Sequence, residues 1–320
     1  MLKWVLALSL LLLAPQEEPI KVGIIGLDTS HVVAFTQLLN DPKNPNHVPG
    51  AKVVCAFKGG SPDVESSASR VEGFTKTLQE KWGVEIVDSI EKLCTKVDCV
   101  LLESVDGRPH LEQARPVFAA KKKVFIDKPL AGSLKDGREI ARLSKESGTP
   151  FFSASSIRFY ETILKTKEDP DLGKILGCES FGHFSTEPHH PDLFWYGVHA
   201  VEGLFTVMGP GCESVTRVEA GDTMVVVGKW KGGRIGTFRG MKKGGKEYGV
   251  TIFGEKAERS SLALKGKNGY ANLVVEIVKF FKTGTPPVSV DEMIEVLAFM
   301  EAADVSKAKG GAEVRLDELK

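Results

Sequence analysis

The sequence carries no excess of either charge, because 42 Lys and Arg residues balance 42 Asp and Glu residues. It also has no acidic or basic tail, no internal repeat and no low-complexity tract. A protein that binds nucleic acid usually presents a basic patch or stripe, so this balance argues against a nucleic-acid partner. The length of 320 residues suits two domains of roughly 150 residues each.

Long hydrophobic runs are missing except at the N-terminus, where residues 4–13 are apolar and Pro15 follows. This run is too short to span a bilayer and is typical of the core of a signal peptide. No twin-arginine pair and no lipobox cysteine accompany it. We therefore expect residues 1–18 to direct export to the periplasm or the extracellular space, with no membrane span afterwards. A buried N-terminal strand or helix is the alternative.

Cysteine is scarce, and five residues leave at least one unpaired. Cys94 and Cys99 are spaced too widely for a redox C-x-x-C motif or a zinc knuckle. Cys55 and Cys99 lie in apolar stretches and are expected to act as small core residues. An exported chain permits a disulfide, but the spacing does not identify a pair.

Short apolar runs alternate with helical patterns in the first half of the chain. The predicted strands are residues 22–25, 53–57, 84–87, 99–102, 124–126 and 151–154. This alternation predicts an α/β fold with a doubly wound parallel sheet. Apolar residues at helical spacing predict a first helix that ends near Asn40, and a helix from Ser133 to Gly148 precedes Pro150. We place this Rossmann-like domain at residues 19–150.

The second half, residues 151–320, has a different pattern. Residues 224–230 and 234–239 predict a hairpin, and residues 248–253 and 260–264 predict further strands. Helical patterns occur at residues 195–208, 271–282 and 291–309. We expect an α+β domain with an open, mostly antiparallel sheet and helices on one face.

The segment from Lys21 to His31 predicts a strand, a tight turn and a helix, like the G-x-G-x-x-G turn that cradles a dinucleotide pyrophosphate. Gly26 takes the place of the first glycine, Asp28 the second and His31 the third. A carboxylate about 4 Å from a phosphate costs on the order of 4 kcal/mol at an effective dielectric of 20. The turn therefore predicts a bound dinucleotide, but the carboxylate of Asp28 opposes the binding of its phosphates.

Several segments in order resemble the glucose-fructose oxidoreductase and inositol dehydrogenase family, often called Gfo/Idh/MocA. They are residues 22–31, His110, residues 127–129, Arg158-Phe159, residues 173–177, residues 197–199 and residues 281–316. The resemblance implies a Rossmann domain followed by an α/β domain whose open sheet mediates homo-oligomerisation. It also implies a bound NAD or NADP that oxidises or reduces a sugar or polyol.

Two residues are the predicted catalytic pair. Asp127-Lys128-Pro129 resembles the family's Glu-Lys-Pro motif, whose lysine contacts the nicotinamide ribose and a substrate hydroxyl. Lys128 follows a predicted strand, at the edge of the sheet where ligands bind. His199 is the predicted acid or base, because imidazole titrates near neutral pH. The alternatives are a solvated charge for Lys128 and a packed side chain for His199.

The resemblance also assigns cofactor-binding positions, namely Gly26, Leu27, Asp28, Thr29, Ser30, His31, Lys58, His110 and Lys128. Lys58 follows the second strand, where an acidic residue normally binds the adenosine ribose. A lysine there pairs with a 2′-phosphate, so NADP is at least as well suited as NAD. A solvated loop lysine is the alternative.

The predicted substrate-binding residues are Arg158, His189, His190 and Trp195. Trp195 stands four residues before His199, where the family commonly has an aspartate, and Asp192 lies about one turn further upstream. His183, Glu187 and the adjacent pair His189-His190 offer metal-ligand types, but no H-x-x-x-H spacing is present. We therefore predict a substrate-lining loop and no metal.

From these features we predict an NAD(P)-dependent oxidoreductase for a small sugar, polyol or sugar derivative. The alternative is a cofactor-independent lyase or isomerase, or a carbohydrate-binding protein, in which residues 28–31 form a polar site in place of the phosphate cradle. A purely structural role for the second domain is the third possibility.

Overall fold

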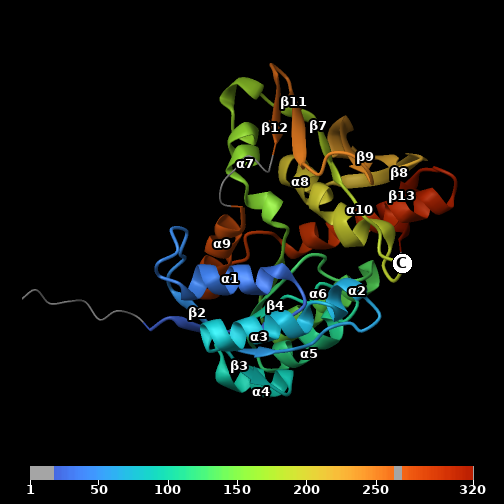
Figure 1. The fold of residues 1–320 in the computed structure, drawn as a ribbon. Helices are drawn as coiled ribbons and strands as arrows, with labels where there is room; N and C mark the ends of the chain where they lie inside the picture. The colour runs from blue at the N-terminus through green and yellow to red at the C-terminus, as the bar shows by residue number, and fades with distance from the viewer. Residues whose placement is uncertain (1–17, 263–268, 320) are drawn as a thin grey trace, which may run out of the picture.

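The computed structural model describes residues 18–262 and 269–319, which form two layered domains (Figure 1). The first contains a six-stranded sheet in the order β3-β2-β1-β4-β5-β6, with parallel pairing throughout. Its strands are β1 (Ile20–Ile25), β2 (Ala51–Phe57), β3 (Glu85–Val87), β4 (Cys99–Leu102), β5 (Lys123–Ile126) and β6 (Phe151–Ser153). The predicted doubly wound sheet is confirmed.

Helices cover both faces of this sheet. One face carries α1 (Ser30–Asn40), α3 (Val71–Trp82) and α9 (Gly269–Thr283), and the short helix α2 (Glu65–Ala68) precedes α3. The other face carries α4 (Ile90–Lys96), α5 (His110–Ala119) and α6 (Leu134–Ser147). The strands are therefore buried on both sides, which explains their continuous apolar runs.

Local sequence signals set the ends of the helices. The Thr29 side chain accepts a hydrogen bond from the His31 N–H at the start of α1. Ser133 caps α6 in the same way, and Gly148 ends that helix in the left-handed conformation at φ +66°. Both helices lie where the sequence predicts them.

The second domain contains a seven-stranded sheet in the order β12-β11-β7-β10-β9-β8-β13. Every neighbouring pair is antiparallel except β10 and β7. The strands are β7 (Ile175–His183), β8 (Cys212–Ala220), β9 (Thr223–Trp230), β10 (Arg234–Met241), β11 (Gly249–Gly254), β12 (Glu258–Leu262) and β13 (Val314–Arg315). The predicted hairpin is β9–β10, and the last two residues of the predicted strand 260–264 lie outside the described residues.

Helices α7 (Glu161–Lys167), α8 (Val198–Met208) and α10 (Val290–Ala308) pack on this second sheet. A π-helical turn, Leu193–Gly197, leads directly into α8. The other face of the sheet is open, and Ile235 and Phe253 on it are exposed. The open sheet and the helices on one face match the expected architecture.

Two segments beyond residue 150 pack with the first domain. Strand β6 belongs to the first sheet, so the first domain extends past residue 150. Helix α9 also returns to the first domain, where the Phe280 ring packs against Phe152 with centroids 5.1 Å apart. Contacts between aromatic residues that are far apart in sequence hold α9 on the first domain. The spacing of apolar residues within the helix does not predict such contacts.

The five cysteines are all buried and unpaired in the structure. Within the described residues, no helix has both the length and the apolar character needed to cross a membrane. The signal segment is predicted at residues 1–18. Residues 1–17 lie outside the described residues, and the description begins at Glu18.

Candidate active site

A cavity of about 220 Å³ opens between the two domains, beside the C-terminal ends of β1 and β5. The neighbours of β1 are β2 and β4, so the chain reverses its strand order here, the place where open α/β sheets bind ligands. The cavity is lined by Thr29, Ser30, His31, Arg70, Val105, Lys128, Ser156, Ile157, Tyr160, Tyr196, His199, Tyr248 and Tyr270. Polar, cationic and aromatic side chains thus converge on one space from both domains. A larger depression of about 500 Å³ beside α6 and α10 is shallow and open and contains neither Lys128 nor His199.

The turn after β1 keeps its first glycine for a structural reason. Gly26 has φ +86°, and a Cβ there would lie 2.5 Å from the Ser104 backbone nitrogen. The next loop also packs closely, since the Gly26 N–H donates to Phe57 O at 3.0 Å and the Leu27 N–H donates to Lys58 O at 2.8 Å. Neighbouring backbone therefore packs closely against the turn and leaves no room for a side chain at Gly26.

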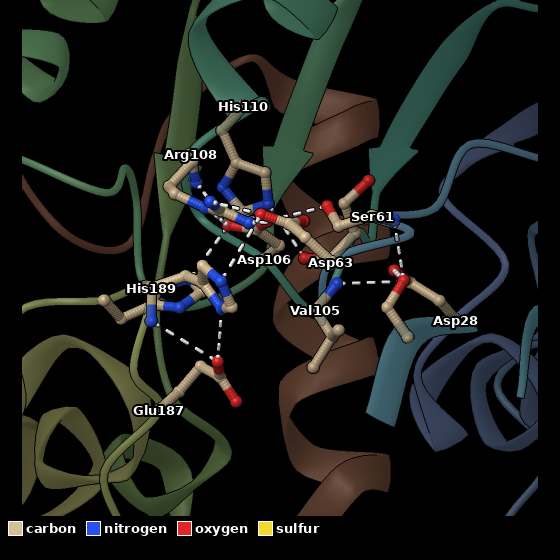
Figure 2. Close-up of polar contacts among 12 residues, drawn as sticks. Asp28, Ser61, Asp63, Val105, Asp106, Arg108, His110, Glu187 and His189 are labelled. Carbon is tan, nitrogen blue, oxygen red and sulfur yellow. Dashed lines mark hydrogen bonds and ion pairs between the residues drawn. The ribbon is translucent and has the colours of Figure 1, made fainter. Parts of the chain in front are cut away.

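Asp28, at the second glycine position, is completely buried. Its Oδ1 accepts a hydrogen bond from the Val105 N–H at 2.9 Å, and its Oδ2 accepts one from the Ser67 hydroxyl at 2.6 Å (Figure 2). The carboxylate therefore ties the turn after β1 to the loop after β4 and to α2. In dinucleotide-binding members of this fold, the glycine at this position leaves room for the pyrophosphate.

A second polar network joins the loops after β2 and β4. The Ser61 hydroxyl donates to Asp106 Oδ2 at 2.6 Å, and the Ser61 N–H donates to Ser67 Oγ at 2.7 Å. Arg108 binds Asp106 and also donates to both Asp63 oxygens at 2.9 Å (Figure 2). Side chains of the chain itself thus join the loops after β2 and β4.

These contacts bear directly on whether a dinucleotide fits. The space that the second glycine would leave holds the Asp28 side chain, and the adjoining loops are joined across it by hydrogen bonds. Asp28 thus takes up space that the second glycine of the fingerprint usually leaves to a pyrophosphate.

Lys128 lines the cavity and is largely buried. Its Nζ lies 4.0 Å from Asp127 Oδ2 and 5.9 Å from the centre of the Tyr196 ring. Asp127 also lies 2.8 Å from Nδ1 of His31. Burial works against the charged form of Asp127, but the charges of His31 and Lys128 outweigh it and lower the pKa of that carboxyl. An ion-paired lysine therefore stands at the wall of the cavity.

His199 reaches the same cavity from α8 in the second domain. Its Nδ1 lies 2.8 Å from the Ser155 hydroxyl. Burial, followed by the positive charge of Lys128, holds the pKa of His199 well below its usual value of 6.5. The imidazole is therefore neutral near pH 7 and is able to accept a proton. The structure brings together the two residues predicted to be catalytic.

Arg158, predicted to bind substrate, lies elsewhere. It is buried between Glu202 and Glu292, and its Nε donates to Glu202 Oε2 at 2.6 Å. It does not line the cavity. Two carboxylates, 44 and 134 positions away in sequence, hold the guanidinium inside the second domain, so the structure does not bring this predicted substrate residue to the cavity.

The other predicted substrate residues also do not line the cavity. His190 is buried and its Nε2 lies 2.8 Å from Asp106 Oδ1, while Trp195 packs beside it with ring centroids 4.8 Å apart. His189 pairs with Glu187 Oε1 at 2.8 Å (Figure 2). This loop therefore fastens the second domain to the β4–α5 loop instead of lining the site.

Two predicted cofactor residues are engaged by other groups. Lys58 forms an ion pair with Glu72 on α3. His110 is fully buried, and its Nε2 lies 2.8 Å from the Ser104 carbonyl oxygen. Gly26, Leu27 and Asp28 are buried in the turn, whereas Thr29, Ser30, His31 and Lys128 line the cavity.

Sequence reasoning missed Glu103 and the aromatic wall of the cavity. Glu103 follows β4 and is completely buried, near Nδ1 of His31. Its position one residue past the apolar run Cys99–Leu102 is the available signal, because polar residues after parallel strands meet at one edge of the sheet. Tyr160, Tyr248 and Tyr270 come from separate elements, and no spacing links them.

Comparison with known proteins agrees with this fold. Residues 20–155 match the family described as an oxidoreductase family with an NAD-binding Rossmann fold. A protein of Streptococcus pneumoniae serotype 4 described as an uncharacterized oxidoreductase is 26% identical over 161 residues, which cover 44% of this chain and 42% of that protein. The 2,7-anhydro-N-acetylneuraminate hydratase of Mediterraneibacter gnavus is 24% identical over 134 residues, which cover 40% of this chain and 35% of the relative. Each alignment thus spans less than half of the relative's length.

Solved structures match nearly the whole chain. A probable dehydrogenase from Thermotoga maritima has a TM-score of 0.77 at 20% identity, with 94% of this chain and 100% of that one covered. The Lactobacillus casei myo-inositol dehydrogenase, solved with NAD(H) and myo-inositol, has a TM-score of 0.73 at 17% identity, with 93% and 97% covered. The Rossmann domain of this chain, residues 20–155, thus matches the Gfo/Idh/MocA family of oxidoreductases.

Proposed function

We propose that this protein binds one small, hydroxyl-rich molecule of the sugar or sugar-acid class and catalyses proton transfer at a carbon beside its carbonyl group. Tyrosine rings with hydroxyl tips, together with Thr29 and Ser30, suit a ligand that is apolar on its ring face and polar at its edge. Arg70 and Lys128 add two cationic groups, which favour a ligand with a carboxylate.

His199 and Lys128 take different roles in this reaction. The neutral imidazole of His199 removes the proton from the carbon, and the Lys128 ammonium stabilises the negative charge that develops on the carbonyl oxygen. Return of the proton to the neighbouring carbon gives an isomer. Loss of a β-hydroxyl group as water gives an unsaturated product, the outcome of a lyase.

The observation that carries this proposal is the buried carboxylate of Asp28, which is held by Val105 and Ser67 at the position of the second glycine. A reaction based on proton transfer alone needs no hydride carrier. The hydratase of Mediterraneibacter gnavus, whose name denotes addition or removal of water, indicates that lyase chemistry occurs among the relatives.

An NAD(P)-dependent oxidoreductase is the second candidate, favoured by the family match over residues 20–155. In that case His199 takes the hydroxyl proton as hydride leaves the same carbon. Lys58 pairs with Glu72 at the surface, and a 2′-phosphate of NADP would compete with that carboxylate for the lysine.

Solvent exchange separates the two candidates. Purified protein is incubated in D₂O with a panel of sugars, keto sugars and sugar acids, with and without added nicotinamide cofactors, and followed by NMR. We expect deuterium incorporation or elimination without cofactor, reduced at least about 100-fold by His199→Gln. Thr77→Ala, on the exposed side of α3, is the matched control. Turnover that requires added or bound nicotinamide establishes the second candidate instead.

Location and assembly are separate proposals. We propose that the N-terminal segment directs export, which a fractionation experiment on the full chain tests. We also propose that the open face of the second sheet joins two copies. Ile235 and Phe253 are 53% and 45% exposed there and flank Gly177 on β7. Light scattering of Ile235→Lys should show a smaller species than the unchanged protein.

A further inference from the structure

We propose that His31, Glu103 and Asp127 bind a divalent metal ion at the floor of the cavity. One nitrogen and two carboxylate oxygens, one from each residue, all lie within 4.8 Å of one another, and all three residues are buried. The three residues come from the start of α1 and from the ends of β4 and β5. This inference concerns binding and does not depend on the reaction proposed above.

Glu103 supplies the independent observation. Its side chain has no exposed surface, and neither carboxylate oxygen has a hydrogen-bond partner in the described part of the chain. Asp127 Oδ1 is also buried without a partner. Buried carboxylate oxygens are almost always hydrogen-bonded or bound to a metal, so these three atoms require a ligand.

The charges around Glu103 point to a cation. Its charged neighbours are Asp127 and Asp28, which repel it, and Lys128, which attracts it. Lys128 and the imidazole of His31 therefore face three carboxylates in a buried region. Lys128 lies 4.0 Å from Asp127, and both Asp28 oxygens already accept hydrogen bonds, so Glu103 is the carboxylate of the three that has no hydrogen bond to either oxygen.

The distances suit ligands of one ion after a small movement. His31 Nδ1 lies 3.8 Å from Glu103 Oε2 and 2.8 Å from Asp127 Oδ2. Two donors on one ion, each about 2.1 Å from it, are at most roughly 4.2 Å apart. The His31 ring is fixed by stacking on Phe35, with centroids 5.3 Å apart and planes inclined by 7°. Such positioning of a ligand by its surroundings is common at metal sites.

The chemistry of the donors selects the class of metal. Imidazole with carboxylates suits Mn²⁺, Fe²⁺ or Zn²⁺ better than Ca²⁺, which takes six to eight oxygen ligands. His31 also lines the cavity, so an ion held there would face a ligand in that space. The remaining coordination positions are then available to two oxygens of a hydroxyl-rich molecule or to water.

Mn²⁺ binding to purified protein, treated with EDTA and then dialysed, tests the inference without a substrate. We expect calorimetry to give one Mn²⁺ per chain, with at least a tenfold weaker affinity in Glu103→Gln and in His31→Gln. Asp63→Asn, a carboxylate of the neighbouring network, should leave the affinity unchanged. Circular dichroism and thermal unfolding check that each variant is folded.

Pulsed EPR of the Mn²⁺ complex supplies a second measurement that does not depend on variant stability. We expect a nitrogen coupling from imidazole in the unchanged protein. The inference is overturned if no Mn²⁺ binds at millimolar concentration, which leaves a proton on Glu103 as the neutralising partner. It is also overturned if binding shows no nitrogen coupling or persists at full affinity in Glu103→Gln.

Discussion

Asp28 accepts a hydrogen bond from the backbone N–H of Val105 at 2.9 Å, where a dinucleotide-binding relative leaves an open space beside a glycine. The same carboxylate accepts the Ser67 hydroxyl at 2.6 Å. One side chain thus closes the phosphate cradle and fastens together the loops around it. The Rossmann fold is retained, while the second glycine position of its first turn holds a buried carboxylate.

This arrangement makes Asp28 important for stability. We expect Asp28→Ala to lower the free energy of unfolding by about 2 kcal/mol or more, because the Val105 N–H and the Ser67 hydroxyl lose a buried partner. Urea unfolding measures the change, and Asp28→Asn, which keeps an acceptor oxygen, is the milder control. An unchanged unfolding midpoint for the alanine variant would show that the carboxylate is not held as described.

Asp106 makes stability depend on pH. Burial opposes its charged form, but contacts with His190, Arg108 and Ser61 outweigh burial and hold the pKa of Asp106 well below its usual range. A depressed folded-state pKa gives stability that is fully present above the unfolded pKa, about 3.9, and is lost as the pH falls below it. Unfolding free energies from pH 7 to pH 2 should therefore fall less steeply for Asp106→Asn, which is also less stable at pH 7 by about 2 kcal/mol. If the unfolding free energy falls equally steeply with pH in both proteins, Asp106 is not a source of this pH dependence.

His199 sets the acid limit of activity. Because burial and Lys128 lower the pKa of this imidazole, the base remains neutral below pH 6.5, and the acid limb of the pH–rate profile should lie below that value. Lys128→Met removes the nearby positive charge, so we expect NMR titration of His199 to show a higher pKa in that variant. An equal titration midpoint in both proteins would show that Lys128 does not lower the pKa of His199.

Arg158 tests the distinction between a structural and a substrate-binding arginine. We expect Arg158→Met to cost about 3–5 kcal/mol of stability, because Glu202 and Glu292 are left buried without a cation. Adding Glu202→Gln and Glu292→Gln should restore most of the loss, and ligand affinity of that triple variant should match the unchanged protein. If Arg158→Met folds with normal stability but no longer binds ligand, Arg158 is a substrate-binding residue.

The sequence predicts the fold well because its signals are local. The continuous apolar strand Ile20–Ile25, the Thr29 cap and the glycine stop after α6 are each set by nearby residues. Lys128 and His199 were also predicted to share a site, since each follows a recognisable local pattern. Strand β6, which is predicted at residues 151–154, pairs with β5 in the first sheet, and helix α9 packs on the same domain.

The parts that could not be predicted depend on distant partners. Whether Arg158 reaches a substrate depends on Glu202 and Glu292, and the place of His190 depends on Asp106 in the other domain. Glu103 is an ordinary charged residue in the sequence, and its isolation appears only once β1, β4 and β5 stand side by side. Residue type alone does not show which polar atoms remain without a partner.

The central claim, that Asp28 and its neighbours fill the dinucleotide cradle, is tested most directly by calorimetric titration of the purified protein with NAD⁺, NADH, NADP⁺ and NADPH. Mass spectrometry of the denatured protein accompanies the titration and detects any carried nicotinamide. We predict no carried cofactor and no binding of any of the four at millimolar concentration. One equivalent of nicotinamide cofactor per chain, carried or bound, would contradict the account.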